Sequence, residues 1–296
     1  IVRERAVVRD MIGVAHDIAD AGYDTQGRTA AELLDFAETK VFKIAEQRAK
    51  ANEGPEPINS ILAKTIDKID ALYRSPQNGI TGVSTGYVDL DKMTNGLQPS
   101  DLIIVAARPS MGKTTLAQNI AVNMVKETGK TGVFFSLEMT KESVIQRLIS
   151  ATGSVRLGAI RSGDLGVDGD SRFNNTTEWG RMVEAMDEVK NLSYVIDDTN
   201  GLTVGEMRSV LNKIRREQGE IGVIMVDYIQ IMGGIDESGN TARQIGNITR
   251  ELKGFGKEFD CPVIALSQLN RSLETRGNKR PIMSDLRESG AIEQDA

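Results

Sequence analysis

The chain has 296 residues, of which 40% are hydrophobic and 4% aromatic, and its formal net charge is −6. This composition fits one large folded domain, or a large and a small one, and the acidic balance argues against a protein that coats its whole surface with nucleic acid. A locally basic channel stays compatible with it. The single cysteine, Cys261, rules out an internal disulfide, and its place before a proline and an apolar run predicts a buried core residue. No apolar stretch is long enough to span a bilayer and no signal peptide is visible, so we expect a cytoplasmic protein without a membrane partner.

Residues 1–48 are predicted to form a helical hairpin, the end of an N-terminal helical domain. Apolar residues recur at helical spacing until Ala21 and Gly22, and Thr29 with Glu32 has the spacing of a capping box that begins a second helix. Two short helices cannot bury their apolar stripe alone, so they need further parts of a domain or a partner hairpin. The chain opens on Ile-Val-Arg-Glu-Arg and closes on Glu-Gln-Asp-Ala without a start or stop signal, and we therefore expect a longer protein truncated at both ends.

Residues 49–79 are interpreted as a linker that carries one helix. Proline, glycine and charged residues dominate 49–57, and apolar residues at helical spacing predict an amphipathic helix over 58–73. The apolar face of this helix needs a surface to cover it. Packing on the following domain and docking on a neighbouring subunit fit the sequence equally well.

Residues 80–296 alternate apolar runs with amphipathic helices, which is typical of an α/β domain with a mainly parallel sheet. The predicted strands are 102–107, 132–137, 192–197, 222–227 and 261–267. The predicted helices are 113–126, 141–151, 177–190, 203–218 and 244–259. Residues 152–176 are rich in Gly, Asp, Ser and Asn, and no element is predicted there.

A phosphate-binding loop is predicted where the first of these strands meets its helix. The backbone N–H groups of the loop and of the first helical turn form an anion site, because they lack partners inside the helix. Lys113 adds a point charge against the β- and γ-phosphates of ATP, and the Thr114 hydroxyl is suited to ligate Mg²⁺. Ala107 stands where the usual pattern has its first glycine. The predicted nucleotide-binding residues are Arg108, Pro109, Ser110, Met111, Gly112, Lys113, Thr114 and Thr115.

Three further strands end in polar side chains that suit nucleotide hydrolysis. Functional groups of doubly wound sheets lie at the carboxyl ends of strands, so these residues should meet the phosphate loop. Asp227 ends one strand in the form that holds Mg²⁺, and Glu138 follows another and can polarise the attacking water. Gln268 ends a third with a neutral amide that can sense the γ-phosphate. A polar residue that merely ends a strand is common singly, but three such residues together with a phosphate loop favour a hydrolysis site.

Five segments together resemble the DnaB family of bacterial replicative DNA helicases, and the likeness covers essentially the whole chain. They are residues 107–115 (Ala-Arg-Pro-Ser-Met-Gly-Lys-Thr-Thr), 135–139 (Phe-Ser-Leu-Glu-Met), 225–230 (Met-Val-Asp-Tyr-Ile-Gln), 266–273 (Leu-Ser-Gln-Leu-Asn-Arg-Ser-Leu) and 285–290 (Asp-Leu-Arg-Glu-Ser-Gly). The alanine at the first glycine position also fits that family. The resemblance implies a RecA-like P-loop ATPase domain preceded by an N-terminal helical hairpin and a linker helix. It further implies a homohexameric ring that uses ATP to move 5′→3′ on single-stranded DNA and to unwind duplex DNA, with primase and a helicase loader as partners.

The resemblance also assigns roles to single residues. Lys113 and Thr114 would bind phosphate and Mg²⁺, and the catalytic carboxylate, the metal-binding acid and the γ-phosphate sensor would be Glu138, Asp227 and Gln268. The residues that would meet the DNA backbone in the central channel are Arg287, Glu288 and Gly290. Without the likeness, an ordinary polar loop would be the preferred interpretation of 285–290.

The chain departs from the family pattern at residues 233–247, where a second channel-facing loop would lie. Thr241 stands where an arginine is expected, and Gln244 and Asn247 stand where acids are usual. The arginine finger of the family would lie beyond residue 296. Two other functions stay open: a RecA-like ATPase that does not unwind DNA, which would not be expected to carry the hairpin and the linker helix, and an assembly collar that uses ATP only to hold a ring.

Overall fold

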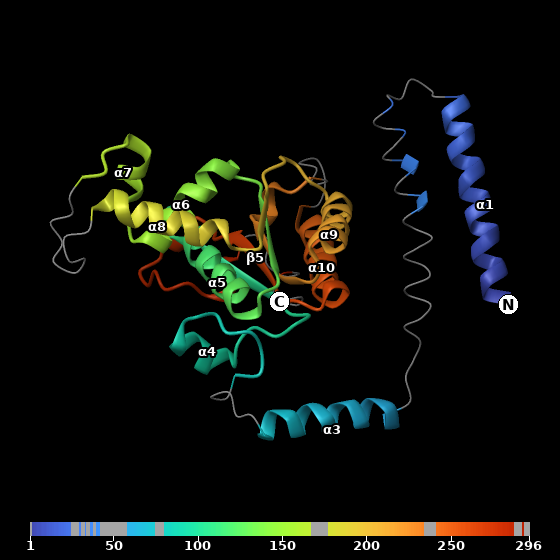
Figure 1. Ribbon diagram of the computed structural model, residues 1–296, viewed down its shortest axis with the longest axis horizontal. Coiled ribbons are helices and arrows are strands. Elements are labelled where there is room, and N and C mark those ends of the chain that lie inside the picture. The colour runs from blue at the N-terminus through green and yellow to red at the C-terminus, as the bar shows by residue number, and fades with distance from the viewer. Residues whose placement is uncertain are drawn as a thin grey trace. The chain divides into compact units, whose positions relative to one another are not determined.

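The computed structural model divides the chain into two units, residues 1–76 and 77–296, each with its own set of contacts (Figure 1). The residues that the structure describes are 2–24, 30, 33, 36–37, 40–41, 58–74, 80–166, 177–233, 241–286 and 292. The linker residues 49–57 and the predicted boundary at 48 therefore lie outside the described residues. Every helix in the described part of the chain is too short or too polar to cross a bilayer.

The described part of the first unit contains two long helices. Helix α1 (Val2–Tyr23) continues through the predicted break at Gly22, which a helix tolerates at a cost of about 1 kcal/mol. Later described positions are also helical, and an ion pair of 2.7 Å joins Lys40 to Asp17 of α1. Helix α3 (Ile58–Arg74) matches the predicted linker helix to within one residue and exposes its apolar side chains to solvent.

The second unit is built on a five-stranded parallel sheet in the order β1-β5-β4-β2-β3. The strands are β1 (Leu102–Ala107), β2 (Thr131–Ser136), β3 (Tyr194–Asp197), β4 (Ile221–Asp227) and β5 (Val263–Gln268). Each was predicted to within two residues at both ends. The parallel arrangement and the helical connections agree with the α/β class expected from the alternating pattern.

Two hydrophobic cores lie on opposite faces of this sheet, because successive strand residues point to opposite sides. On β4, Val223 and Met225 belong to the core under α5, whereas Ile224 and Val226 belong to the core under α9 and α10. All four are fully buried. Cys261 is buried in the second of these cores, and its burial raises the pKa of the thiol to about 12, as befits a core residue.

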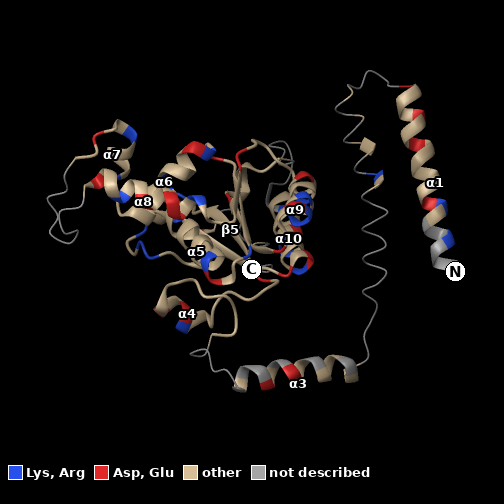
Figure 2. Ribbon diagram, in the orientation of Figure 1, with Lys and Arg blue, Asp and Glu red and all other residues tan. Residues whose placement is uncertain are grey.

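Helices cover both faces of the sheet (Figure 1). The group on one side is α5 (Lys113–Thr128), α6 (Lys141–Gly153) and α8 (Glu178–Lys190), and the group on the other is α9 (Val204–Gln218) and α10 (Thr241–Phe259). Threonine side chains begin three of them: the N-caps of α6, α8 and α9 are Thr140, Thr177 and Thr203. Both basic and acidic positions occur on these helices (Figure 2).

Several short elements were not predicted. They are α4 (Val88–Thr94), α7 (Leu157–Ser162), α11 (Ser272–Thr275) and the 3₁₀ turns η2 (Ile229–Ile231) and η3 (Met283–Asp285). Arg156, just before α7, donates two hydrogen bonds of 2.8 Å to the buried carboxylate of Glu178 on α8. The Arg156 guanidinium thereby holds the pKa of Glu178 below its usual value. This contact joins the residue before α7 to the first residue of α8.

Candidate functional site

The phosphate loop joins β1 to α5. Gly112 lies immediately before α5 in the left-handed region with φ 82°, which favours glycine strongly over other residues. Ala107 is the last residue of β1 and is not among the residues with a positive φ, so its backbone conformation does not require the usual first glycine of the pattern. The first hydrogen bond that Gly112 accepts from α5 comes from Leu116 (3.0 Å), which leaves the earlier N–H groups of the helix directed at the loop. These groups form the anion site.

A cavity of about 260 Å³ lies over this loop. Residues from the ends of four strands and from α6 surround it: Ala107, Arg108, Pro109, Ser110, Gly112, Lys113, Thr114, Glu138, Met139, Arg147, Tyr228 and Gln268. Six of the eight predicted nucleotide-binding residues are in this set. Met111, which is 75% exposed, and Thr115 are not.

Lys113 and Thr114 both contact the acid at the end of β4. Nζ of Lys113 lies 3.2 Å from Oδ1 of Asp227, and the Thr114 hydroxyl donates a hydrogen bond of 2.6 Å to Oδ2. The ammonium also lies over the Tyr228 ring, 4.6 Å from its centre. The predicted phosphate-binding lysine is therefore paired with the predicted metal-binding acid.

Asp227 is chemically suited to hold a cation. Its side chain is fully buried, and Oδ1 accepts no hydrogen bond even though Lys113 is close. Mg²⁺ is commonly held by one or two protein oxygens together with substrate phosphates and water, so a single carboxylate beside the Thr114 hydroxyl fits it. Among the described residues, no group of three or more His, Cys, Asp or Glu side chains could hold a metal by itself. The donor set therefore suits a metal that arrives with a nucleotide.

Glu138 and Gln268 reach the same cavity from β2 and β5. The N–H of Leu137 donates a 2.9 Å hydrogen bond to the carbonyl of Asp227, which keeps Glu138 beside the end of β4. The Glu138 side chain is exposed and lines the cavity. Gln268 pairs in register with Ala107, so it stands at the first residue of the phosphate loop. The sheet thus gathers the three predicted strand-end residues, Glu138, Asp227 and Gln268, at one edge.

Arg147 is a residue that sequence reasoning missed. It lies on α6, lines the cavity, and its Nε is buried without a hydrogen-bond partner. A guanidinium with a buried free donor is ready for an anion, because an unpaired buried polar group is costly. No signal in the sequence separates this arginine from one on a solvated helix face.

Arg108 was predicted to bind nucleotide, and its side chain is engaged elsewhere. Its Nη1 donates a 3.0 Å hydrogen bond to the carbonyl of Leu269, and its Nε donates one of 2.8 Å to Glu274. Both partners belong to the segment after β5. Arg108 therefore joins the phosphate loop to that segment, while its remaining atoms border the cavity.

The predicted DNA-contacting residues Arg287, Glu288 and Gly290 lie outside the described residues. The last described position before them is Leu286, which forms an isolated antiparallel bridge with Leu269. Of the second predicted channel loop, residues 234–240 are outside the described part, and α10 begins at Thr241, three residues before the predicted start.

Comparison with known proteins agrees with this architecture. A family model described as "DnaB-like helicase C terminal domain" matches residues 82–296. A relative named "Replicative DNA helicase DnaB" from Pasteurella multocida is 49% identical over 298 residues, which is 100% of this chain and 62% of the relative. A second of that name, from Buchnera aphidicola subsp. Schizaphis graminum, is 50% identical over 96% of this chain and 59% of its own length. The chain thus spans about three fifths of the length of these curated relatives.

Solved structures give the same result for the fold. One, described as an ATPase domain, superposes with a TM-score of 0.72 at 35% identity and covers 82% of both chains. "The Structure Of A DnaB-Like Replicative Helicase And Its Interactions With Primase" superposes with a TM-score of 0.76 at 32% identity, over 100% of this chain and 65% of the other. The second unit is therefore a RecA-like ATPase fold, as the resemblance implied.

Proposed function

The chain belongs to the DnaB-like helicase family, and on that premise we propose that it hydrolyses ATP to move 5′→3′ on single-stranded DNA and to unwind duplex DNA at the replication fork. We propose further that it acts as a homohexameric ring in the cytoplasm. One observation carries the proposal: Lys113 at the start of α5 and Glu138 and Gln268 at the ends of two strands line one cavity, with Asp227 paired to that lysine. A protein that only binds a nucleotide would not need these residues to meet at one cavity.

The geometry supports a specific order of events at Lys113. Before nucleotide binds, its ammonium is held by Asp227 and by the Tyr228 ring. An arriving phosphate group offers a stronger partner, so Lys113 turns from Asp227 to the β- and γ-phosphates. This exchange frees Oδ1 of Asp227, while the Thr114 hydroxyl still donates to Oδ2. Mg²⁺ would be held by these two residues, where it neutralises the charge that develops on the phosphates.

Glu138 and Gln268 have complementary roles in hydrolysis. The Glu138 carboxylate accepts a proton from the attacking water and orients it, which is general-base work. Gln268 contributes a neutral amide that hydrogen-bonds the γ-phosphate and loses that bond after hydrolysis. Arg147 supplies charge to the same phosphates through its free Nε. A second arginine, from a neighbouring subunit, would complete the site in a ring.

The proposed partners rest on chemistry and on one relative. Arg287, Glu288 and Gly290 are proposed to meet the DNA backbone, where a charged side chain and a close main-chain N–H track phosphates without reading sequence. One solved neighbour is described with its interactions with primase, which supports a primase partner. A helicase loader is proposed from the family alone. We propose that the apolar face of α3 docks on a neighbouring subunit of the ring, and packing on the second unit of its own chain is the alternative.

Replacement of Glu138 by glutamine in the full-length protein tests the proposal. We expect ATP hydrolysis to fall by about 10²- to 10⁴-fold, as for loss of a general base, and strand separation to stop. Nucleotide binding and the hexamer should persist. Glu142→Gln is the matched control, because this exposed glutamate lies four residues further along the chain, in the first turn of α6, and does not line the cavity. Unwinding by Glu138→Gln at the normal rate would refute the catalytic role, and an unaltered protein that hydrolyses ATP in a ring without unwinding would support a collar.

A further inference from the structure

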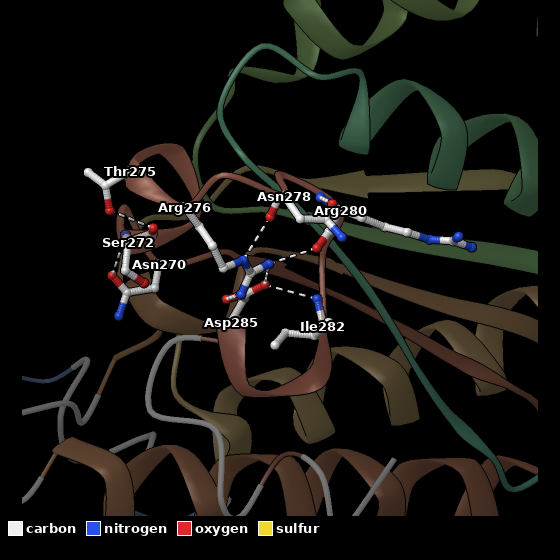
Figure 3. A network of polar contacts seen from close by, with 8 residues as sticks. All are labelled: Asn270, Ser272, Thr275, Arg276, Asn278, Arg280, Ile282 and Asp285. Atoms are coloured by element: carbon white, nitrogen blue, oxygen red, sulfur yellow. Dashed lines mark hydrogen bonds and ion pairs between the residues drawn. The ribbon is translucent and has the colours of Figure 1, made fainter.

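A bidentate ion pair between Arg276 and Asp285 joins two parts of the segment that follows β5. Nη1 and Nη2 of Arg276 each donate a 2.9 Å hydrogen bond to a different carboxylate oxygen of Asp285 (Figure 3). A bidentate contact of this kind fixes the orientation of the guanidinium and the carboxylate as well as the distance between them. Asp285 is 4% exposed, and the Arg276 guanidinium holds the pKa of this carboxyl below its usual range. The pair is therefore charged at neutral pH and is part of the fold.

The remaining donors of the Arg276 guanidinium also point into the segment. Nε donates to the carbonyl of Asn278 at 2.8 Å, and Nη2 donates to the carbonyl of Arg280 at 2.7 Å. Asp285 in turn accepts a 2.9 Å hydrogen bond from the N–H of Ile282. Figure 3 shows Asn278, Arg280 and Asp285 around this guanidinium. Because these donors bond within the segment, the Arg276 side chain stabilises the loop and is not a free surface charge.

The closed loop is attached directly to the strand that ends in Gln268. The N–H of Asn270 donates a 2.8 Å hydrogen bond to the carbonyl of Asp285, and Leu269 bridges Leu286. The residue after the proposed γ-phosphate sensor is therefore paired with the residue before Arg287. Arg108 of the phosphate loop holds the same segment through Leu269 and Glu274. Residues 269–286 form one continuous set of contacts from the nucleotide cavity to the start of the proposed DNA stretch.

We propose that Arg276 is a positioning residue: its ion pair with Asp285 gives residues 269–286 the fixed shape through which DNA held after Leu286 stimulates hydrolysis at the nucleotide cavity. The inference rests on the proposed function. It assigns Arg276 no contact with DNA or ATP. Loosening the pair removes the rigid connection, whereas the cavity keeps all of its own residues.

Charge alone predicts the opposite result for one substitution. Asp285→Asn removes a negative charge close to a proposed DNA contact, so simple electrostatics predicts tighter DNA binding. The positioning role predicts weaker DNA stimulation, because the fork of Arg276 loses its carboxylate. Arg276→Lys separates the two explanations in the same way: it keeps the positive charge and loses the two-pronged geometry.

The experiment measures ATP hydrolysis by the full-length protein with and without single-stranded DNA of mixed sequence. For Arg276→Lys and Asp285→Asn we expect basal hydrolysis within about twofold of normal, and DNA stimulation reduced about 10- to 100-fold, the effect of a slightly misplaced functional group. Arg280→Gln is the matched control. Figure 3 shows its side chain directed away from the pair, so it should at most weaken DNA binding in a salt-dependent way.

The outcomes are decisive in both directions. Normal basal hydrolysis with lost stimulation in both variants supports the positioning role and also shows that the cavity is folded. Normal stimulation by Arg276→Lys, or stronger stimulation by Asp285→Asn, overturns it. Loss of basal hydrolysis in both variants also overturns it, because the pair would then serve the fold of the cavity itself. An unaltered protein without any DNA stimulation would refute the proposed function, and this inference with it.

Discussion

Replacing Lys113 by methionine tests whether the nucleotide-free site is held together by its own ion pair. Methionine keeps an unbranched apolar stem against Tyr228 and removes only the ammonium. Asp227 would then stay fully buried with one remaining polar partner, the Thr114 hydroxyl. A buried carboxylate that loses its cation destabilises the folded state. We therefore expect the nucleotide-free protein to unfold more easily.

The size of the effect follows from the distance and the exposure. At 3.2 Å between Nζ and Oδ1, Coulomb attraction at an effective dielectric constant of about 20 is about 5 kcal/mol before desolvation is counted. Removing one partner of a buried pair lowers the free energy of unfolding by about 3–5 kcal/mol. Lys113 is 12% exposed and faces a cavity that water can enter. We therefore expect Lys113→Met to lose about 2–4 kcal/mol.

Urea denaturation without nucleotide measures this loss. Far-UV circular dichroism follows the whole chain, and fluorescence of Trp179, the single tryptophan, follows the unit that holds the site. Combining Lys113→Met with Asp227→Asn completes a double-mutant cycle, in which we expect a coupling of about 1–3 kcal/mol. Lys126→Met is the control on the same helix, because it breaks a half-exposed pair with Glu188 that is worth about 0–1 kcal/mol.

Either of two results would contradict the ion pair between Lys113 and Asp227. Additive effects of the two site substitutions would mean that Lys113 and Asp227 do not interact in the nucleotide-free state. A loss for Lys113→Met no larger than that for Lys126→Met would mean that solvent screens the site as it screens the surface. In both cases the proposed exchange of Lys113 from Asp227 to phosphate would lose its basis.

Two further predictions concern the missed arginine and the linker helix. Arg147→Met should weaken ATP binding by about 10- to 100-fold in a fluorescent-nucleotide titration, which is the contribution of one charged hydrogen bond. The control Arg161→Met, on α7, should leave the affinity unchanged. Equal affinities of the two variants would show that Arg147 does not bind the nucleotide. The double substitution Ile66→Asp and Ile69→Asp should dissociate the hexamer in native mass spectrometry, while the separated chains still bind ATP. The control Asp67→Ala, on the same helix, should leave the hexamer intact. Intact hexamers of the double variant would instead favour packing of α3 within its own chain.

The strands and the main helices were predictable because their signals are local. The six apolar residues of β1 and the seven-residue run of β4 each end at a polar or loop-forming residue, and both strands appear where the pattern placed them. The start of β3 was wrong by two residues. The turn after α8 continues further than the apolar run indicated, with the N–H of Leu192 bonded to the carbonyl of Val189.

Features that depend on distant pairs were not predictable. Nothing in the sequence orders the strands as β1-β5-β4-β2-β3, and that order is what brings Gln268 level with the phosphate loop. Helix α4 follows a polar turn, and no element was predicted there. Its Asp91 is buried and accepts hydrogen bonds from Ser84 and Thr85, which gives the turn a fixed shape. Burial of Arg147 in the cavity likewise depends on how α6 packs, which no local pattern contains.

The placement of β5 between β1 and β4 sets the distance between the two halves of the site. Neighbouring strands lie about 4.8 Å apart, so the phosphate loop and the strand of Asp227 stand about 10 Å from one another, with Gln268 on the strand between them. Backbone hydrogen bonds fix this spacing, and loop changes elsewhere cannot alter it. A one-residue slip of β5 would bring Ser267 or Leu269 to the level of Ala107 and turn the side chain to the opposite face. Insertions should therefore be tolerated in the connecting loops and excluded from β5, so that the lengths of loops can drift among relatives while the length of this strand cannot.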